Sequence, residues 1–195
     1  MECMKVIYLF RHGEPERLEG VPDSEWPLSQ QGRLHALELR RIPVTRGFSS
    51  PYRRASETTQ LAGHSFTLDA RLRERTPGSA STEMGDCWLR QYEDPDFKCP
   101  GGESLAEVGQ RMADCLADIL GALKEWESAL VVSHAAAICA WLMRFCCVRV
   151  TDRAAKVRSV TWRGKQVYVG GLPPLSGFRL LFGPEGLTEI KPIAL

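Results

Sequence analysis

Two apolar runs in the chain have the pattern of buried strands. Residues 6–10 read Val-Ile-Tyr-Leu-Phe, residues 129–132 read Ala-Leu-Val-Val, and neither run alternates with polar residues. Strands that are buried on both faces of a parallel sheet have this continuous apolar character. The first run ends at Arg11 and His12, and the second leads into His134. The pattern therefore predicts two inner strands that bring both histidines to the carboxyl edge of one sheet, where open α/β sheets bind their ligands.

A long helix is predicted in the middle of the chain. Apolar residues repeat at intervals of three and four from Leu105 to Leu123, which predicts a helix with one apolar face. Ser104 and Glu107 have the spacing of a capping box at its start. The segment 135–148 is apolar nearly all round, which is typical of a helix packed deep against a sheet. We interpret both segments as core elements that need no cofactor.

Two further helix starts precede these segments. Ser29 is expected to cap a helix that runs to about Arg41, with Leu34 and Leu37 facing inward. The second start is Ser50 followed by a proline, which is the pattern of an N-cap and a first helical position.

Two arginines, Arg53 and Arg54, follow this second start and fall in the first turn of the predicted helix. A helix dipole favours anions at that end rather than cations. The conflict is relieved if an anion docks there and bonds both the arginine and the exposed N–H groups. The alternative is a pair of solvated arginines on an exposed turn.

Short strands complete the pattern. They are expected around residues 47–49 and 66–68, and β-like pieces follow at 157–162 and 166–169, whose pairing the sequence does not show. Strands and helices alternate through most of the chain, and this order is typical of an α/β fold. We predict a three-layer α/β/α sandwich with a mainly parallel central sheet.

The length is compatible with a single domain over residues 1–195. Residues 76–101 are rich in Gly, Pro, Ser, Asp and Glu, and Trp88, Leu89 and Tyr92 are their clear apolar anchors. We expect this segment to be a partly helical, lid-like insertion over one end of the sheet.

The charge balance argues against a general attraction to polyanions. The chain has 25 Lys and Arg against 24 Asp and Glu, a net charge of +1, so no global field recruits nucleic acid or a membrane surface. No apolar stretch reaches the roughly 18 residues of a membrane span. Residues 1–5 include Glu2 and lack the pattern of a signal peptide. We expect a cytoplasmic protein with neither nucleic acid nor membrane as partner.

The seven cysteines do not form a C-x-x-C pair, so a zinc site is not expected. Cys115, Cys139, Cys146 and Cys147 lie in apolar helical patterns, where a free cysteine behaves as a small hydrophobe. We therefore expect reduced thiols, no metal and no cofactor.

Three predicted strand-to-helix junctions carry chemistry: one holds Arg11 and His12, the second Arg54, and the third His134. In a mainly parallel sheet these junctions share one edge. Arginine offers a fork of donors suited to a phosphoryl group, and histidine can attack phosphorus. Each motif alone also fits ordinary structural or surface residues. Together they predict a pocket for a phosphoryl dianion, and the absence of a Walker-type G-x-x-x-x-G-K-[ST] sequence excludes a P-loop.

This combination of motifs resembles the histidine phosphatase superfamily, also called the phosphoglycerate mutase-like family. In chain order the motifs are Arg11-His12-Gly13-Glu14, Ser49-Ser50-Pro51-Tyr52-Arg53-Arg54-Ala55, Leu72-Arg73-Glu74, Gly101-Gly102-Glu103-Ser104 and Val132-Ser133-His134. The resemblance implies that His12 is the nucleophile that becomes phosphorylated. It also implies that Arg11, Arg54 and His134 clamp the phosphoryl oxygens. Glu74 would match the general acid that protonates the leaving oxygen.

Several positions depart from the family pattern. Pro15 and Leu18 stand where members often have a Ser or Thr and an Asn that touch phosphate. Ala135 and Ala136 stand where two glycines commonly follow the second histidine, although an alanine keeps its backbone amide. The usual Gly-x-Trp-Glu-Gly after the acid is absent, so Glu83 is the alternative acid.

The resemblance implies a phosphatase that hydrolyses a small phosphomonoester through a phosphohistidine intermediate. A mutase is the second hypothesis, although such enzymes are usually longer and enclose their substrate with segments not found in this sequence. The third is a catalytically silent module that binds a phospho-ligand or a protein, because the contacts at Pro15 and Leu18 are missing. Sugar phosphates, nucleotide-pathway monophosphates such as α-ribazole phosphate, and phosphoproteins all stay open as substrates.

Overall fold

A six-stranded mixed sheet forms the centre of the computed structural model, which describes residues 4–79 and 86–195. The strand order is β3-β2-β4-β1-β8-β9. The four parallel strands are β1 (Lys5–Arg11), β2 (Arg46–Ser49), β3 (Phe66–Leu68) and β4 (Ser128–Ser133). The antiparallel strands β8 (Ser176–Gly183) and β9 (Gly186–Ala194) extend the sheet beyond β1. The predicted α/β class with a mainly parallel sheet is confirmed.

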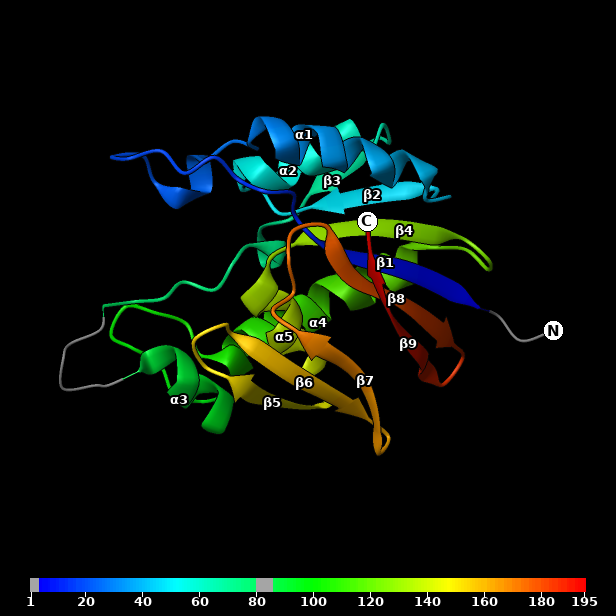
Figure 1. The fold of residues 1–195 in the computed structure, drawn as a ribbon. Helices are drawn as coiled ribbons and strands as arrows, with labels where there is room; N and C mark the ends of the chain where they lie inside the picture. Colours follow the sequence, from blue (N-terminus) through cyan, green and yellow to red (C-terminus); the bar gives the residue numbers. More distant parts are fainter. Residues whose placement is uncertain (1–3, 80–85) are drawn as a thin grey trace.

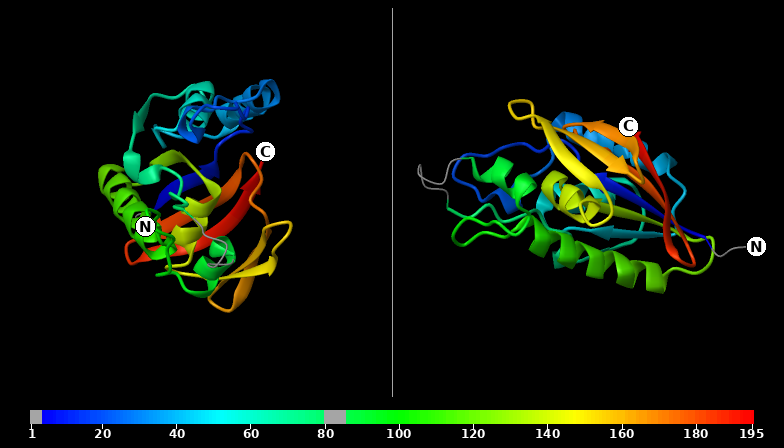
Figure 2. Two further views of the ribbon diagram at one scale, coloured as in Figure 1. Left: turned by 90° about the vertical axis from the view of Figure 1, so that its left-hand side faces the viewer. Right: turned by 90° about the horizontal axis from the view of Figure 1, so that it is seen from below.

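Helices cover both faces of this sheet (Figure 1). One face carries α1 (Gln30–Ala36), the 3-10 helix η2 (Leu37–Arg41) and α2 (Arg53–Leu61). The other face carries α4 (Leu105–Ala122) and α5 (Ala135–Leu142), and both views in Figure 2 show α4 on the side of the sheet away from α1 and α2.

The inner strands have a continuous apolar sequence because each of their faces is buried against a different set of helices. Leu9 and Val131 belong to the apolar cluster on the side of α4 and α5. Phe10 and Leu130, their chain neighbours, belong to the cluster on the side of α1 and α2. Successive side chains of a strand point to opposite faces, so each run is buried on both sides of the sheet.

Helix α1 turns a different side to the sheet than the sequence pattern predicts. Ser29 does cap it, since its side chain accepts a hydrogen bond from the Gly32 amide, but Leu34 is 55% exposed. The helix packs through Gly32 and Ala36 instead. A Cβ on Gly32 would lie 2.2 Å from the backbone oxygen of Glu14, so the helix approaches the chain more closely than any side chain would allow. This close approach fixes the rotation of the helix and points Leu34 to solvent.

Helix α5 is shorter than the predicted segment 135–148. It ends at Leu142, and Cys147 begins the strand β5 (Cys147–Asp152). At the start of β5 exposed and buried residues alternate, with Val148 buried between two exposed neighbours. Alternation with a period of two is typical of a strand, so residues from Cys147 onward form β5 although their apolar composition suggested a helix.

A second, antiparallel sheet is formed by β5, β6 (Val157–Trp162) and β7 (Lys165–Gly170). It lies on the side of α5, below the central sheet in Figure 1. Arg163 and Gly164, with φ angles of 50° and 78°, make the turn between β6 and β7.

The described part of the predicted insertion contains α3 (Cys87–Glu93), and residues 80–85 lie outside the described residues. In Figure 1 this part and the loop that contains the 3-10 helix η1 (Asp23–Glu25) project from the same end of the central sheet, where β1 finishes. The short 3-10 helix η3 (Ala70–Leu72) precedes the insertion. Both excursions therefore stand beside the predicted site.

The expectation of reduced thiols is wrong for one pair, because Cys87 and Cys99 form a disulfide. The twelve positions that separate them gave no sign of proximity; the return of the chain after α3 brings them together. Cys115 and Cys139 are free and buried, as expected of small hydrophobes. Among the described residues, no helix is long and apolar enough to cross a membrane.

Candidate active site

The pairing of β1 with β4 places the two histidines side by side. Arg11 is opposite Ser133 in the parallel register, so the next residues on both strands leave the sheet at the same level. The backbone amide of His12 donates to the Ser133 carbonyl oxygen over 3.0 Å, and the ring centroids of His12 and His134 are 4.9 Å apart. His12 is 4% exposed and His134 is fully buried.

The hydrogen bonds of His12 define its protonation state. Nδ1 lies 2.6 Å from the Gly13 carbonyl oxygen, which can only accept, so Nδ1 carries the hydrogen. Nε2 accepts a hydrogen bond from Nε of Arg54 over 3.1 Å. Burial holds the pKa of His12 well below its ordinary value, and the nearby Arg54 and Arg11 lower it further. His12 is therefore a neutral imidazole with its Nε2 lone pair directed into the site.

His134 has the complementary arrangement. Its Nε2 lies 2.8 Å from the Ser50 hydroxyl oxygen, and its Nδ1 lies 3.3 Å from Nη2 of Arg54. Because a guanidinium can only donate, Nδ1 accepts and Nε2 carries the hydrogen. Burial lowers the pKa of His134 well below its ordinary value, and the proximity of His12 and Arg54 adds to this effect.

Arg54 reaches the histidines from the first turn of α2, but Ser50 is not the cap that the sequence suggested. The helix begins at Arg53 and its N-cap is Tyr52, which makes no side-chain capping bond. The Ser50 hydroxyl accepts instead from the Tyr52 amide over 3.2 Å and contacts His134. Ser50 is thus used to hold a site histidine, and the helix starts later.

A contact that the sequence did not predict joins Arg54 to Asp23 of η1. Nη1 of Arg54 donates to the Asp23 carbonyl oxygen, and Nη2 lies 3.4 Å from Asp23 Oδ2. The Arg54 side chain is only 6% exposed, while that of Asp23 is 56% exposed. No sequence pattern predicts this contact, because Asp23 lies in the short helix η1 of a loop whose position only the folded chain defines.

Arg11 lies at the same edge and faces a cavity of about 320 Å³. Its Nη1 donates to the Leu172 carbonyl oxygen over 2.7 Å, and its buried Nε has no hydrogen-bond partner within the described part of the chain. Burial lowers the pKa of Arg11, and the carboxylate of Glu74 opposes this shift. An anion in the cavity would satisfy the unused donors of this guanidinium.

Glu74 lines the same cavity and is held at the N-terminus of α5. Its carboxylate accepts hydrogen bonds from the backbone amides of Ala136 and Ala137, over 3.3 and 3.1 Å. Two backbone amides that follow His134 therefore donate hydrogen bonds to Glu74, although the glycines of the family pattern are absent. Glu83, the alternative acid, lies outside the described residues.

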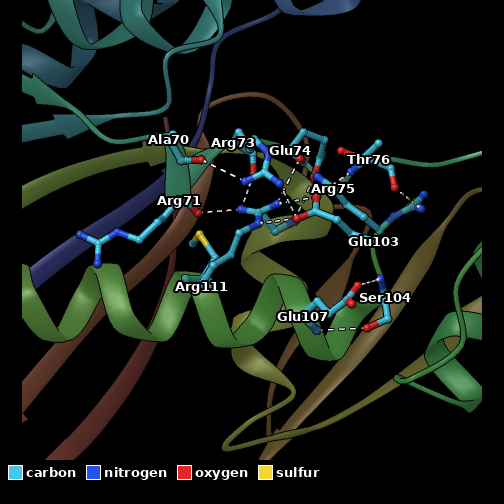
Figure 3. Close-up of polar contacts among 12 residues, drawn as sticks. Ala70, Arg71, Arg73, Glu74, Arg75, Thr76, Glu103, Ser104, Glu107 and Arg111 are labelled. Atoms are coloured by element: carbon cyan, nitrogen blue, oxygen red, sulfur yellow. Dashed lines mark hydrogen bonds and ion pairs between the residues drawn. The ribbon is translucent and has the colours of Figure 1, made fainter. Parts of the chain in front are cut away.

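The segment that carries Glu74 is held from behind by Arg111 of α4 (Figure 3). The Arg111 guanidinium donates to the backbone oxygens of Arg71, Arg73 and Glu74, over 2.6, 2.9 and 3.1 Å. It also donates to both carboxylate oxygens of Glu103, over 2.9 and 3.1 Å. In the sequence, Glu103 is marked only as part of a motif. Arg111 has no mark of its own, because it looks like any polar position of an amphipathic helix.

The five predicted site residues thus lie at one end of the sheet, as two neighbouring groups. Two neutral imidazoles share one buried guanidinium, and a second guanidinium and a carboxylate line the adjoining cavity. Within residues 4–79 and 86–195, no group of three or more His, Cys, Asp or Glu side chains is arranged to hold a metal ion. Fold and site together define a protein class in which a histidine and arginines meet a phosphoryl group at the carboxyl edge of an α/β sheet.

The chain belongs to the histidine phosphatase superfamily (branch 1), whose family model matches residues 7–155. It is 32% identical over 157 residues to the probable phosphoglycerate mutase GpmB of Salmonella choleraesuis, an alignment that covers 69% of this chain and 72% of the relative. The predicted family is confirmed.

Solved structures with the same fold include the crystal structure of TTHB049, a protein from Thermus thermophilus. It is 28% identical, with a TM-score of 0.59 over 97% of this chain and 99% of that protein. A mycobacterial glucosyl-3-phosphoglycerate phosphatase is similar in fold, with a TM-score of 0.68 at 21% identity over 99% of this chain and 97% of that one. A relative by sequence is thus named a probable mutase, and a protein of the same fold is named a phosphatase.

Proposed function

We propose that this protein is a phosphatase that hydrolyses a small phosphomonoester through a phosphohistidine intermediate on His12. The observation that carries the proposal is the state of this side chain: it is buried and neutral, with the hydrogen on Nδ1 held by Gly13 and the lone pair of Nε2 facing Arg54. A neutral nitrogen with a fixed tautomer is what nucleophilic attack on phosphorus requires.

In the first step, the Nε2 lone pair of His12 forms a bond to phosphorus while the bond from phosphorus to the leaving oxygen breaks. Arg54 occupies that lone pair in the free protein. The incoming phosphoryl group takes its place, and the Arg54 donors turn to the phosphoryl oxygens. Arg11 and His134 supply further contacts at the same edge, so that charge on the transferring group meets preorganised donors.

Glu74 is assigned the proton transfers. As an acid it protonates the leaving oxygen in the first step, and as a carboxylate it removes a proton from the attacking water in the second. The water then displaces His12 from phosphorus, and the electron pair of the broken P–N bond returns to Nε2. The position of Glu74 on the cavity wall beside Arg11 supports this assignment.

A mutase is the second candidate, and the similarity to GpmB favours it. Both activities pass through the same phosphohistidine and differ in the group that accepts the phosphoryl. Water takes it in a phosphatase, whereas a substrate hydroxyl takes it in a mutase. Phosphate release and isomerisation of a phosphoglycerate, measured on the same preparation, separate the two.

The proposal is tested by rapid-quench labelling with a radiolabelled phosphomonoester. An acid-labile phosphoprotein is expected in the wild type and in His35→Ala, which removes an exposed histidine of α1, and none in His12→Ala. Absence of the labelled protein from the wild type, together with no phosphate release, would instead support a silent binding module.

A further inference from the structure

The proposed nucleophile is closed off from the cavity that would admit a substrate. Asp23 and Glu74 are among the described residues that line this cavity. His12, His134 and Arg54 are not part of the described lining. His12 and Arg54 are 4% and 5% exposed, and His134 is fully buried. A part of the chain must therefore move before a phosphoryl group can reach His12 from the cavity.

Asp23 contacts both the cavity and the buried cluster, and it does so through Arg54. Its Oδ2 lies 3.4 Å from Nη2 of Arg54, and its main-chain carbonyl oxygen accepts a hydrogen bond from Nη1. The opposite edge of the guanidinium meets His12 and His134 through Nε and Nη2. All three nitrogens are thus engaged in the free protein, and two oxygens of Asp23 occupy donors that suit a phosphoryl group.

The loop that carries Asp23 has a fixed base and a tip, residues 17–25, that folds on itself. At the base, Pro15 and Leu28 form an antiparallel bridge between the two ends of the loop. At the tip, the Trp26 indole donates to two carbonyl oxygens of residues 17–25, over 3.2 and 3.0 Å. The tip can therefore keep its own shape while it moves on its base.

Asp23 connects this tip to the rest of the protein. Across the described chain, the hydrogen bonds that join residues 17–25 to anything beyond Trp26 are the two from Arg54 to Asp23. The Asp23 side chain is 56% exposed. An ion contact of this exposure is weak, so little is lost when it breaks.

A phosphoryl dianion and the Asp23 carboxylate would compete for one guanidinium. The two anions repel each other at contact distance, while Arg54 neutralises a single negative charge. The dianion carries the larger charge and offers three oxygens to the fork of donors, so it is the stronger ligand of Arg54.

We propose that Asp23 is a latch that holds the site closed in the free protein, and that the phosphoryl group of the substrate opens it by taking the Arg54 donors from Asp23. The tip of the loop then moves away from Arg54, and the cavity of Arg11 and Glu74 becomes continuous with His12. This inference rests on the proposed function and adds a gate to it.

The first test measures how accessible His12 is. Diethyl pyrocarbonate ethoxycarbonylates neutral imidazoles, and peptide mass spectrometry gives the rate at His12 relative to the exposed His35 of the same chain. In Asp23→Ala this relative rate is expected to rise about 3- to 10-fold, the range of a weak ion contact. Asp23→Asn, which removes only the charge, is expected to give a smaller rise.

Glu25→Ala is the matched control for these variants. It removes an exposed negative charge from the same short helix η1 and is expected to keep the wild-type rate at His12. Equal rates at His12 in the wild type and in Asp23→Ala would overturn the latch.

The second test is the affinity for inorganic phosphate, measured by titration calorimetry. Asp23→Ala is expected to bind phosphate about 3- to 10-fold more tightly than the wild type, because no internal anion has to be displaced, and Glu25→Ala is expected to bind it as the wild type does. For a phosphomonoester substrate, kcat/KM should rise in Asp23→Ala by a similar factor. Weaker phosphate binding in Asp23→Ala would show that Asp23 positions Arg54 for the ligand, and it would overturn the latch.

The accessibility of His12 and the affinity for phosphate do not depend on turnover, so they separate this inference from the proposed function. Both expected changes in a protein that hydrolyses no phosphomonoester would support the latch without the phosphatase. A working phosphatase in which Asp23→Ala lowers kcat/KM and weakens phosphate binding would retain the proposed function and refute the latch.

Discussion

Nε of Arg54 donates a hydrogen bond to Nε2 of His12 over 3.1 Å, so the guanidinium lies on the lone pair that is proposed to attack phosphorus. The same side chain reaches Nδ1 of His134 over 3.3 Å. Burial keeps both imidazoles neutral, and this one cation adds to the effect and orients them. Asp23 holds the cation in place from outside the cluster.

The contacts of the Arg54 guanidinium with both histidines predict that the rate of hydrolysis depends strongly on this group. Arg54→Lys retains the charge but cannot span His12 and His134, and kcat for p-nitrophenyl phosphate is expected to fall about 100- to 1000-fold. The matched control is Arg53→Lys, since the Arg53 side chain is 51% exposed and pairs with Glu57 of the same helix. Similar rates for Arg54→Lys and Arg53→Lys would remove Arg54 from the mechanism.

The lowered pKa values of His12 and His134 predict how stability varies with pH. Their neutral forms are favoured in the folded protein, whereas in the unfolded chain they bind protons below about pH 6.5. The unfolded state therefore holds more protons in that range, and the free energy of unfolding falls as the pH drops from about 6.5, by up to about 1.4 kcal/mol per pH unit for each histidine. Above about pH 6.5 these two groups contribute no slope.

Urea unfolding between about pH 5.5 and 7.5 measures this slope. The double variant His12→Asn, His134→Asn is expected to lose most of it, while His35→Asn on the exposed face of α1 retains it. A wild-type protein that becomes more stable as the pH falls through this range would show that the buried imidazoles are cationic.

The role of Glu74 is expected to depend on the leaving group. Glu74→Gln cannot donate a proton, so it should slow hydrolysis of alkyl phosphates far more than that of p-nitrophenyl phosphate, whose leaving group needs little protonation. Glu16→Gln, in the exposed part of the loop after β1, serves as the control. Equal losses on both substrates, or a larger selective loss in Glu83→Gln, would assign the acid elsewhere.

Arg111 is expected to act on the reaction through the position of Glu74. Arg111→Met removes the bonds to three backbone oxygens and leaves the Glu103 carboxylate without one of its cations, which should lower the free energy of unfolding by about 3 kcal/mol or more. If the residue positions the acid, kcat for alkyl phosphates should fall about 10- to 100-fold more than kcat for p-nitrophenyl phosphate.

The neighbouring Gln110→Met change on the exposed side of α4 is the control for both measurements. A loss of stability in Arg111→Met with equal effects on the two substrates would show that the residue only holds the fold.

Local pattern was sufficient for the elements that build the site. The apolar runs before His12 and His134 predicted β1 and β4, and the capping box of Ser104 and Glu107 predicted the start of α4. These signals are strong because burial on both faces of a strand, or on one face of a helix, constrains every residue of the segment. The roles assigned to Arg11, His12, Arg54, Glu74 and His134 stay predictions until the variants above are measured.

Long-range packing decided the rest, because no local pattern encodes it. Leu34 points to solvent since Gly32 lets α1 approach the backbone of Glu14, and only the folded chain shows that contact.

The support of Glu74 and the walls of the cavity that it lines depend on packing in the same way. Arg158 reaches the cavity because a separate antiparallel sheet folds beside α5, and Arg111 reaches Glu74 across more than thirty positions of sequence. The sequence by itself determined the family and the order of the strands and helices that it marks, and it predicted the candidate site residues. Tertiary structure determined which charges are left without a partner, since pairing depends on distances between segments that are far apart in the chain.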